Sequence, residues 1–174
     1  RDTALYLQFT SSPTQVSNCL FIANSGAGIR VNYPGRFYNN TFVDNYDGMF
    51  LDITPAQAVD IRNNIFSDNV HSGLHIFDNS TALNLSYNLF FNTVNVIDND
   101  TQRNRNAPSD INQMNGATGN YTGNPFFANN TLTSSGDYHL RGSSPGIDAG
   151  DPAFAYGNEP EPNGSRINLG YDGN

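Results

Sequence analysis

The sequence contains no lysine and no tryptophan, a single cysteine, Cys19, and few charged residues of either sign. One cysteine cannot form an intramolecular disulfide, so the cysteine content says little about the redox compartment. No apolar run is long enough to cross a bilayer, which argues against membrane insertion. The net charge of −8 argues against nucleic acid as a partner, because few cations could replace counterions along a phosphate backbone.

Asparagine and glycine are abundant instead. The 174 residues include 27 asparagines and 16 glycines, both of which disfavour helices and favour turns. No segment keeps a helical periodicity through three turns. The length suits one domain with a sizeable core. The composition therefore predicts a single all-β domain with many turns.

A repeat of 21 to 24 residues runs through the first half of the chain, where one Phe column is spaced 21, 24 and 24 residues apart. A period of this length with three short strands per unit is typical of one coil of a parallel β-solenoid. Coils stack about 4.8 Å apart, so columns of the alignment become ladders in space. The units are VSNCLFIANSGAGIRV (16–31), FYNNTFVDNYDGMFL (37–51), IRNNIFSDNVHSGLHI (61–76) and LSYNLFFNTVNVI (85–97).

The paired asparagines of the repeat are interpreted as architecture. Stacked amides can hydrogen-bond to one another in a place where a lone amide would be costly to bury. The predicted structural ladder contains Asn18, Asn39, Asn40, Asn63, Asn64 and Asn88. Alternation in the closing strands predicts that the inside of one sheet is lined by Leu5, Leu7, Ile29, Val31, Met49, Leu51, Leu74 and Ile76.

These units resemble the right-handed parallel β-helix repeats of pectate-lyase-like proteins, in which an "NN" turn carries a stacked asparagine ladder. The segment GNPFFANNTLTSSGDYHLRGSSPGIDAGDP (123–152) resembles the terminal segment of many bacterial secreted β-helix proteins. The resemblance implies an all-β, right-handed parallel β-helix of about five coils. Residues 1–97 would form coils, and residues 98–174 an excursion, a last coil and a loop-rich C-terminal cap of the same domain. An extracellular or cell-surface location is expected.

The outward positions of the closing strands form a surface column. Its members are Tyr6, Arg30, Phe50 and His75, followed by Asn95. In pectate-lyase-like enzymes a long groove along one sheet binds polysaccharide. The resemblance therefore makes this column the candidate binding surface for a polysaccharide partner.

Catalytic candidates are few. Lyase chemistry on a uronate needs a cation to neutralise the carboxylate and a base to abstract a proton, and the absence of lysine removes one common base. The remaining candidates are His71, His75 and Arg62, with Asp68 and Asp78 near the two histidines in the sequence.

A weak metal site is also predicted. Asp44 and Asp68 share a repeat column and should lie about one coil apart, where two carboxylates repel unless solvated or bridged by a cation. The alternatives for cofactors are therefore none, or Ca²⁺ at this pair.

The sequence supports an extracellular structural or adhesive module, which could bind glycans and assemble end to end. Strand-like residues begin at Ala4 without a visible cap, and an open first coil invites self-association unless upstream coils or another molecule cover it. The alternative is a polysaccharide lyase or glycoside hydrolase, or a fragment of one, acting on acidic polysaccharide. A third reading is a passive stalk of a larger surface protein. Few titratable groups, the lack of lysine and the small number of coils favour the structural module.

Overall fold

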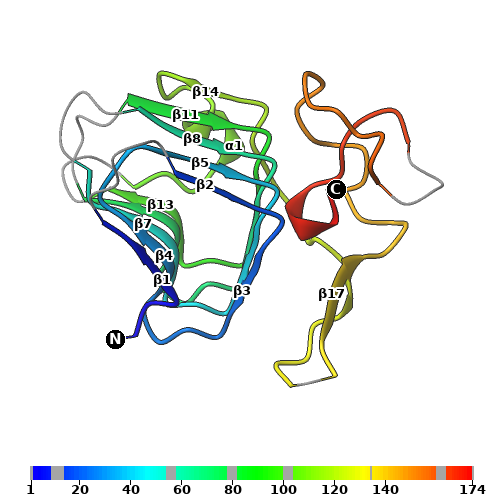
Figure 1. Cartoon of the computed structure of the whole chain (residues 1–174), viewed down its shortest axis with the longest axis horizontal. Coiled ribbons are helices and arrows are strands. Elements are labelled where there is room, and N and C mark those ends of the chain that lie inside the picture. The colour runs from blue at the N-terminus through cyan, green and yellow to red at the C-terminus, as the bar shows by residue number, and fades with distance from the viewer. Residues whose placement is uncertain are drawn as a thin grey trace.

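The computed structural model describes residues 2–8, 14–53, 58–77, 82–99, 104–133, 135–159 and 164–173. The chain winds through three parallel sheets of five strands each (Figure 1). Sheet A contains β1 (Leu5–Leu7), β4 (Ala27–Val31), β7 (Asp47–Leu51), β10 (Ser72–Ile76) and β13 (Asn95–Asn99). Sheet B contains β2 (Thr14–Ser17), β5 (Gly35–Tyr38), β8 (Ala58–Arg62), β11 (Ala82–Ser86) and β14 (Ala117–Thr118). Sheet C contains β3 (Leu20–Ile22), β6 (Thr41–Val43), β9 (Ile65–Ser67), β12 (Leu89–Phe91) and β15 (Tyr121–Thr122).

The predicted parallel β-helix is confirmed, with one strand of each coil in each sheet. The regular part is shorter than the about five coils predicted. Three turns, beginning with β4, β7 and β10, have full-length strands and a closed interior. The first turn is only half buried, and the last has strands of two residues in sheets B and C.

The paired asparagines occupy the turn between sheets B and C and divide into two columns. The first residue of each pair, as in Asn39 and Asn63, has a positive φ of 54° and 58°, a conformation that asparagine tolerates better than most residues. The second residue forms the hydrogen-bonded ladder. Asn40 donates to Asn64 at 3.1 Å, and Asn64 donates to Asn88 at 3.0 Å.

The ladder therefore differs from the predicted set of six. Asn88 donates to Asn120 at 2.9 Å, which extends the ladder by a residue outside the repeat alignment. Asn18, Asn39 and Asn63 belong to the positive-φ column instead. A second amide ladder runs at the turn between sheets C and A, where Asn24 bonds to Asn45 and Asn45 to Asn69.

The interior is filled by the predicted aromatic column. The rings of Phe21, Phe42, Phe66 and Phe90 stack with centroids 5.1, 4.9 and 4.9 Å apart. The inward residues of sheet A complete the core, as expected from strand alternation. The glycine column follows from this packing, because a Cβ on Gly48 would lie 2.5 Å from the carbonyl oxygen of Gly73 and 2.6 Å from the Phe66 ring.

The C-terminal end of the coil stack is covered by residues that precede the last coil. The short helix α1 (Pro108–Ile111) places Ile111 fully inside the core, with Met114 packed beside it. Arg105 forms an antiparallel bridge with Ile97 at the edge of β13. This excursion from the stack acts as the cap, which was expected from later residues.

The segment after Gly123 was predicted to return to the stack, but it leaves the coils and packs beside them (Figure 1). Its hairpin of β16 (Phe127–Asn129) and β17 (Asp137–Leu140) is antiparallel, and a 3₁₀ turn, η1 (Gly170–Asp172), follows. The positive-φ asparagines hold this segment. Asn39 donates to the carbonyl of Gly173 at 2.9 Å, and Asn63 accepts from the backbone N–H of Asp151 at 2.7 Å.

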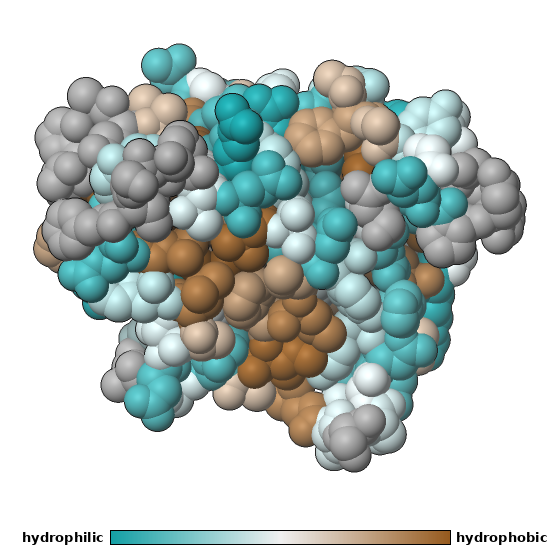
Figure 2. Space-filling model, viewed as in Figure 1, coloured by the Kyte–Doolittle hydropathy of each residue, from teal (hydrophilic) through white to brown (hydrophobic). Residues whose placement is uncertain are grey.

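The opposite end of the coil stack is less well buried. The inward residues of β1, β2 and β3 are half buried, whereas the equivalent residues of β4, β5 and β6 are fully buried. Figure 2 shows apolar surface across this end of the molecule. Among the described residues, no helix has the length and apolar character needed to span a membrane.

Candidate functional site

The predicted outward column of sheet A exists in the structure. The strand register places Tyr6 beside Arg30, Arg30 beside Phe50, and Phe50 beside His75. The guanidinium of Arg30 lies 5.6 Å from the Tyr6 ring centroid and 4.6 Å from that of Phe50, so it lies between two aromatic rings. Asn95 is not in this column, because it pairs with Ser72, and Asp98 takes the position beside His75.

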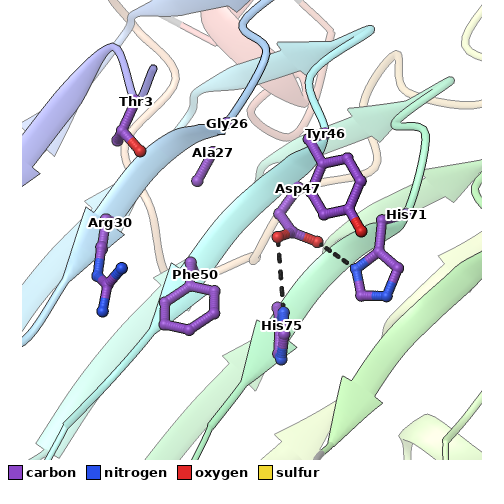
Figure 3. Close-up of a pocket in the computed structure, with 9 residues that line it drawn as sticks. All are labelled: Thr3, Gly26, Ala27, Arg30, Tyr46, Asp47, Phe50, His71 and His75. Carbon is purple, nitrogen blue, oxygen red and sulfur yellow. Dashed lines mark hydrogen bonds and ion pairs between the residues drawn. The ribbon is translucent and has the colours of Figure 1, made fainter. Parts of the chain in front are cut away.

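Next to this column the two histidines converge on one carboxylate (Figure 3). Nδ1 of His71 lies 2.8 Å from Oδ1 of Asp47, and Nδ1 of His75 lies 3.5 Å from Oδ2 of the same residue. The Ser72 hydroxyl donates to Oδ1 at 2.5 Å. Asp47 begins β7, and the other three residues lie at the start of β10 or within it.

The rings of the two histidines are held by aromatic neighbours. His71 stacks on Tyr46, with centroids 4.9 Å apart and ring planes 7° apart. His75 meets Phe50 edge-on at 4.5 Å. Because both imidazoles pack against rings on the preceding coil, their positions depend on strand stacking rather than on a flexible loop.

These residues line a pocket of about 220 Å³ on the outer face of sheet A. Its walls combine Arg30, Phe50 and the Asp47 cluster with backbone near Gly26 (Figure 3). The pocket thus offers a cation, two imidazoles, one carboxylate and two aromatic rings. Such a mixture of apolar wall and a few convergent polar groups is typical of a ligand site.

The carboxylate of Asp47 is ionised at neutral pH. Burial alone would raise the pKa of Asp47, but hydrogen bonds from His75, Ser72 and His71 outweigh that cost and hold the pKa below its ordinary value of 3.8. The site therefore holds a buried negative charge directly beside two imidazoles. A protonated imidazole or a bound cation would each be stabilised there.

The four predicted catalytic candidates do not form one group. Asp68 lies at the turn after β9, where it accepts hydrogen bonds from Ser67 and Asn92, and the carboxylate that meets the histidines is Asp47. Arg62 lies on sheet B, bound to Asp60 at 2.6 Å and to Asp151 at 3.0 Å. Asp78 lies outside the described residues.

The Asp44 and Asp68 column is confirmed as a geometric pair. Both residues have positive φ, of 54° and 56°, and the backbone N–H of Asp44 donates to the carbonyl of Ser67. Burial, and then the charge of Asp68, raises the pKa of Asp44. Within the described part of the chain, the three-residue clusters that could ligate a metal do not include this pair. Calcium binding here remains a prediction.

The role of Asp47 at the site could have been found from the repeat. Asp47 precedes His71 by 24 residues, the same interval that separates Asn45 from Asn69 and Asn40 from Asn64. Applying the repeat interval to His71 therefore identifies its neighbour on the preceding coil. The short sequence distance between Asp68 and the histidines pointed to the wrong carboxylate, because residues close in sequence on one coil occupy different sides of the solenoid.

Comparison with known proteins agrees with the coil geometry. A family model described as a right handed beta helix region matches residues 3–108, more than half of the chain. No curated protein and no solved structure matches the chain. The matched residues cover the coils, from the first strand of sheet A to the helix that caps the last turn. The chain belongs to the family of right-handed β-helix proteins.

Proposed function

We propose that this protein is an extracellular or cell-surface β-helix module that binds a glycan chain along the outer face of sheet A. A single observation carries the proposal: Tyr6, Arg30 and Phe50 occupy adjacent rungs of one column beside the pocket. The face continues to Phe77, whose ring lies 6.3 Å from that of Phe50. A ligand bound there would cross the strands and contact one rung after another.

The chemistry of the column suits a sugar chain. Tyr6 and Phe77 are 48% and 52% exposed, and exposed aromatic surface of this kind marks interaction sites. Aromatic rings can pack against the apolar faces of sugar rings, while a guanidinium donates several hydrogen bonds to hydroxyls or carboxylates. Arg30 is already oriented by Asp52, with Nη2 and Oδ2 2.7 Å apart, so its ordering precedes ligand binding.

Affinity electrophoresis in gels containing neutral or acidic polysaccharides tests this function. We expect retardation by at least one polysaccharide, and Phe50→Ala, Arg30→Ala and Tyr6→Ala should each weaken it at least about tenfold. Tyr156→Ala removes a comparably exposed ring from the lateral segment and should leave retardation unchanged. Equal retardation of wild type and the three column variants would refute the proposed face.

A lyase is the second candidate, because Arg30 and both imidazoles line the same pocket. In a lyase, a uronate carboxylate would be neutralised by the cation while an imidazole accepts the proton. The pocket lining includes one carboxylate, Asp47, whereas most glycoside hydrolases use two. The same protein samples, incubated with pectate, alginate and chondroitin, test this alternative: rising ultraviolet absorbance from an unsaturated product would replace a binding role by a catalytic one.

Self-association through the first coil is the further part of the proposed structural role. The half-buried inward residues of β1–β3 offer an apolar end, whereas α1 and Ile111 cover the opposite end. Contact between two open ends is isologous and closes as a two-fold dimer, not as the end-to-end filament expected from the sequence. Sedimentation velocity at increasing concentration should show a monomer–dimer equilibrium that Leu20→Lys abolishes. A monomer at every concentration would contradict this part.

A further inference from the structure

We propose that Asp47, His71 and His75 form a binding site for a divalent transition-metal ion, with Zn²⁺ the expected occupant. The inference goes beyond glycan binding and does not depend on it. One ligand atom from each residue lies within 4.8 Å of the other two. Two imidazoles and one carboxylate with further positions open is a donor set that binds Zn²⁺ and similar ions in proteins.

The distances between the donor atoms suit a metal ion. In a tetrahedral zinc site with bonds of about 2.0–2.1 Å, neighbouring ligand atoms lie about 3.3 Å apart. The separations from Asp47, 2.8 Å to His71 and 3.5 Å to His75, bracket that value. A change of a few tenths of an ångström in side-chain position would therefore replace both direct contacts by bonds to one ion.

The surroundings favour binding of a cation. Asp47 is 4% exposed and carries a full negative charge in a site of low dielectric, so a bound cation is strongly attracted. The Ser72 hydroxyl donates to the carboxylate and would remain as an outer-shell partner that orients it. Tyr46 and Phe50 fix the two rings.

The remaining coordination positions would face the pocket. Arg30 and Phe50 line that pocket beside His75 (Figure 3). A hydroxyl or carboxylate oxygen from a ligand on sheet A could complete the coordination. The nitrogen donors distinguish this site from the calcium pair predicted at Asp44 and Asp68, since Ca²⁺ takes oxygen ligands.

Titration calorimetry of the tag-free, chelator-treated protein with Zn²⁺ tests the site. We expect one equivalent to bind at neutral pH. The variants His71→Ala, His75→Ala and Asp47→Asn should each lose more than the 10–100-fold in affinity that loss of an outer-shell partner typically costs. Ser72→Ala should lose about tenfold. His139→Ala removes an exposed imidazole that pairs with Asp137 in the lateral hairpin and should bind as wild type does.

Two further measurements keep the proposal falsifiable if a variant folds poorly. Co²⁺ bound to the wild type should give visible absorption bands of a site with nitrogen ligands, and Zn²⁺ should raise the melting temperature of the wild type but not of folded ligand variants. Cys19→Ser controls for binding at the lone thiol and should keep full affinity. Absence of saturable Zn²⁺ binding, tighter binding of Ca²⁺ than of Zn²⁺, or equal loss in His139→Ala would each overturn the proposal.

Discussion

Two outward columns on the same solenoid each centre on an arginine, but only one is covered by the chain's own residues. On sheet B, Arg62 is bound by Asp151 and lies 5.9 Å from the Phe154 ring, both from the lateral segment. On sheet A, the Arg30 column lies beside an open pocket and includes the half-exposed Tyr6. An arginine among aromatic rings is therefore a docking point for the protein itself on one face and a candidate ligand site on the other.

The inner turns behave differently from either face. Along the ladder every rung carries the same amide, and each amide bonds to its neighbours above and below. Along the outer column of sheet A the rungs change from tyrosine to arginine, phenylalanine and histidine. Uniform rungs suit a structural role, because identical groups satisfy one another. Changing rungs offer different chemistry at each step, as recognition requires.

The largest expected effect tests the framework that both columns share. Asn64 is fully buried, and its amide bonds to Asn88 and to the carbonyl of Phe37 while accepting from Asn40. Asn64→Ala should lower the free energy of unfolding by about 3 kcal/mol, because several buried partners lose their bonds. Denaturant unfolding measures this, and Asn32→Ala, which loses one exposed bond to Tyr6, is the matched control. Similar losses in both variants would contradict the ladder's role.

The second prediction separates the two arginines by stability. Arg62 and Asp151 side chains are 24% and 9% exposed, whereas Arg30 and Asp52 are 41% and 36% exposed. Arg62→Ala should cost about 2 kcal/mol, because it leaves a nearly buried carboxylate unpaired, and Arg30→Ala should cost about 0.5 kcal/mol. Thermal and denaturant unfolding of both variants measures the difference. If Arg30→Ala proves the more destabilising, sheet A is not the open face.

Much of the coil architecture could be predicted from the sequence, because a solenoid turns sequence intervals into spatial neighbours. The interval of 24 residues correctly stacked Phe42 on Phe66 and placed Phe50 beside His75. The same interval would have paired Asp47 with His71. Asn95 was misplaced because the coil after His75 lengthens and shifts the register by three residues, to Asp98.

The covered face could not be predicted in this way. After Gly123 the repeat ends, so no interval relates Asp151 to Arg62 or Gly173 to Asn39. Those contacts depend on the path of a segment without periodicity, which returns to coils far away in sequence. Arg62 therefore looked as available for chemistry as Arg30. The difference between the two sheets is a property of tertiary packing.

A smaller effect tests how the lateral segment holds sheet B. The ring of Phe154 meets that of Tyr38 edge-on, with centroids 5.0 Å apart. Phe154→Ala should cost about 1 kcal/mol and make residues after Gly123 more susceptible to limited proteolysis, because an aromatic contact to the coils is lost. Tyr156→Ala, on an exposed ring nearby, should change neither quantity. An unaltered cleavage rate in Phe154→Ala would show that other contacts suffice to hold the segment.

The smallest effect is confined to alkaline solution and concerns Tyr38, whose hydroxyl donates to Asp60 at 2.5 Å. Burial, and then the hydrogen bond and charge of Asp60, raise the pKa of Tyr38 from 10.0 to about 12. The unfolded chain releases this proton at a lower pH than the folded protein. The stabilisation is therefore complete below pH 10 and is lost as pH rises towards 12.

Tyr38→Phe should accordingly make the free energy of unfolding fall less steeply between pH 10 and pH 12 than in the wild type. Urea midpoints at several pH values in that window measure the slope. Burial, with the charges of Asp172 and Asp137, also raises the pKa of Tyr171 to about 12, so the double variant with Tyr171→Phe should flatten the slope further. Parallel slopes in wild type and Tyr38→Phe would mean that the lateral segment does not keep Tyr38 buried, and the contrast between covered and open faces would lose its support at that rung.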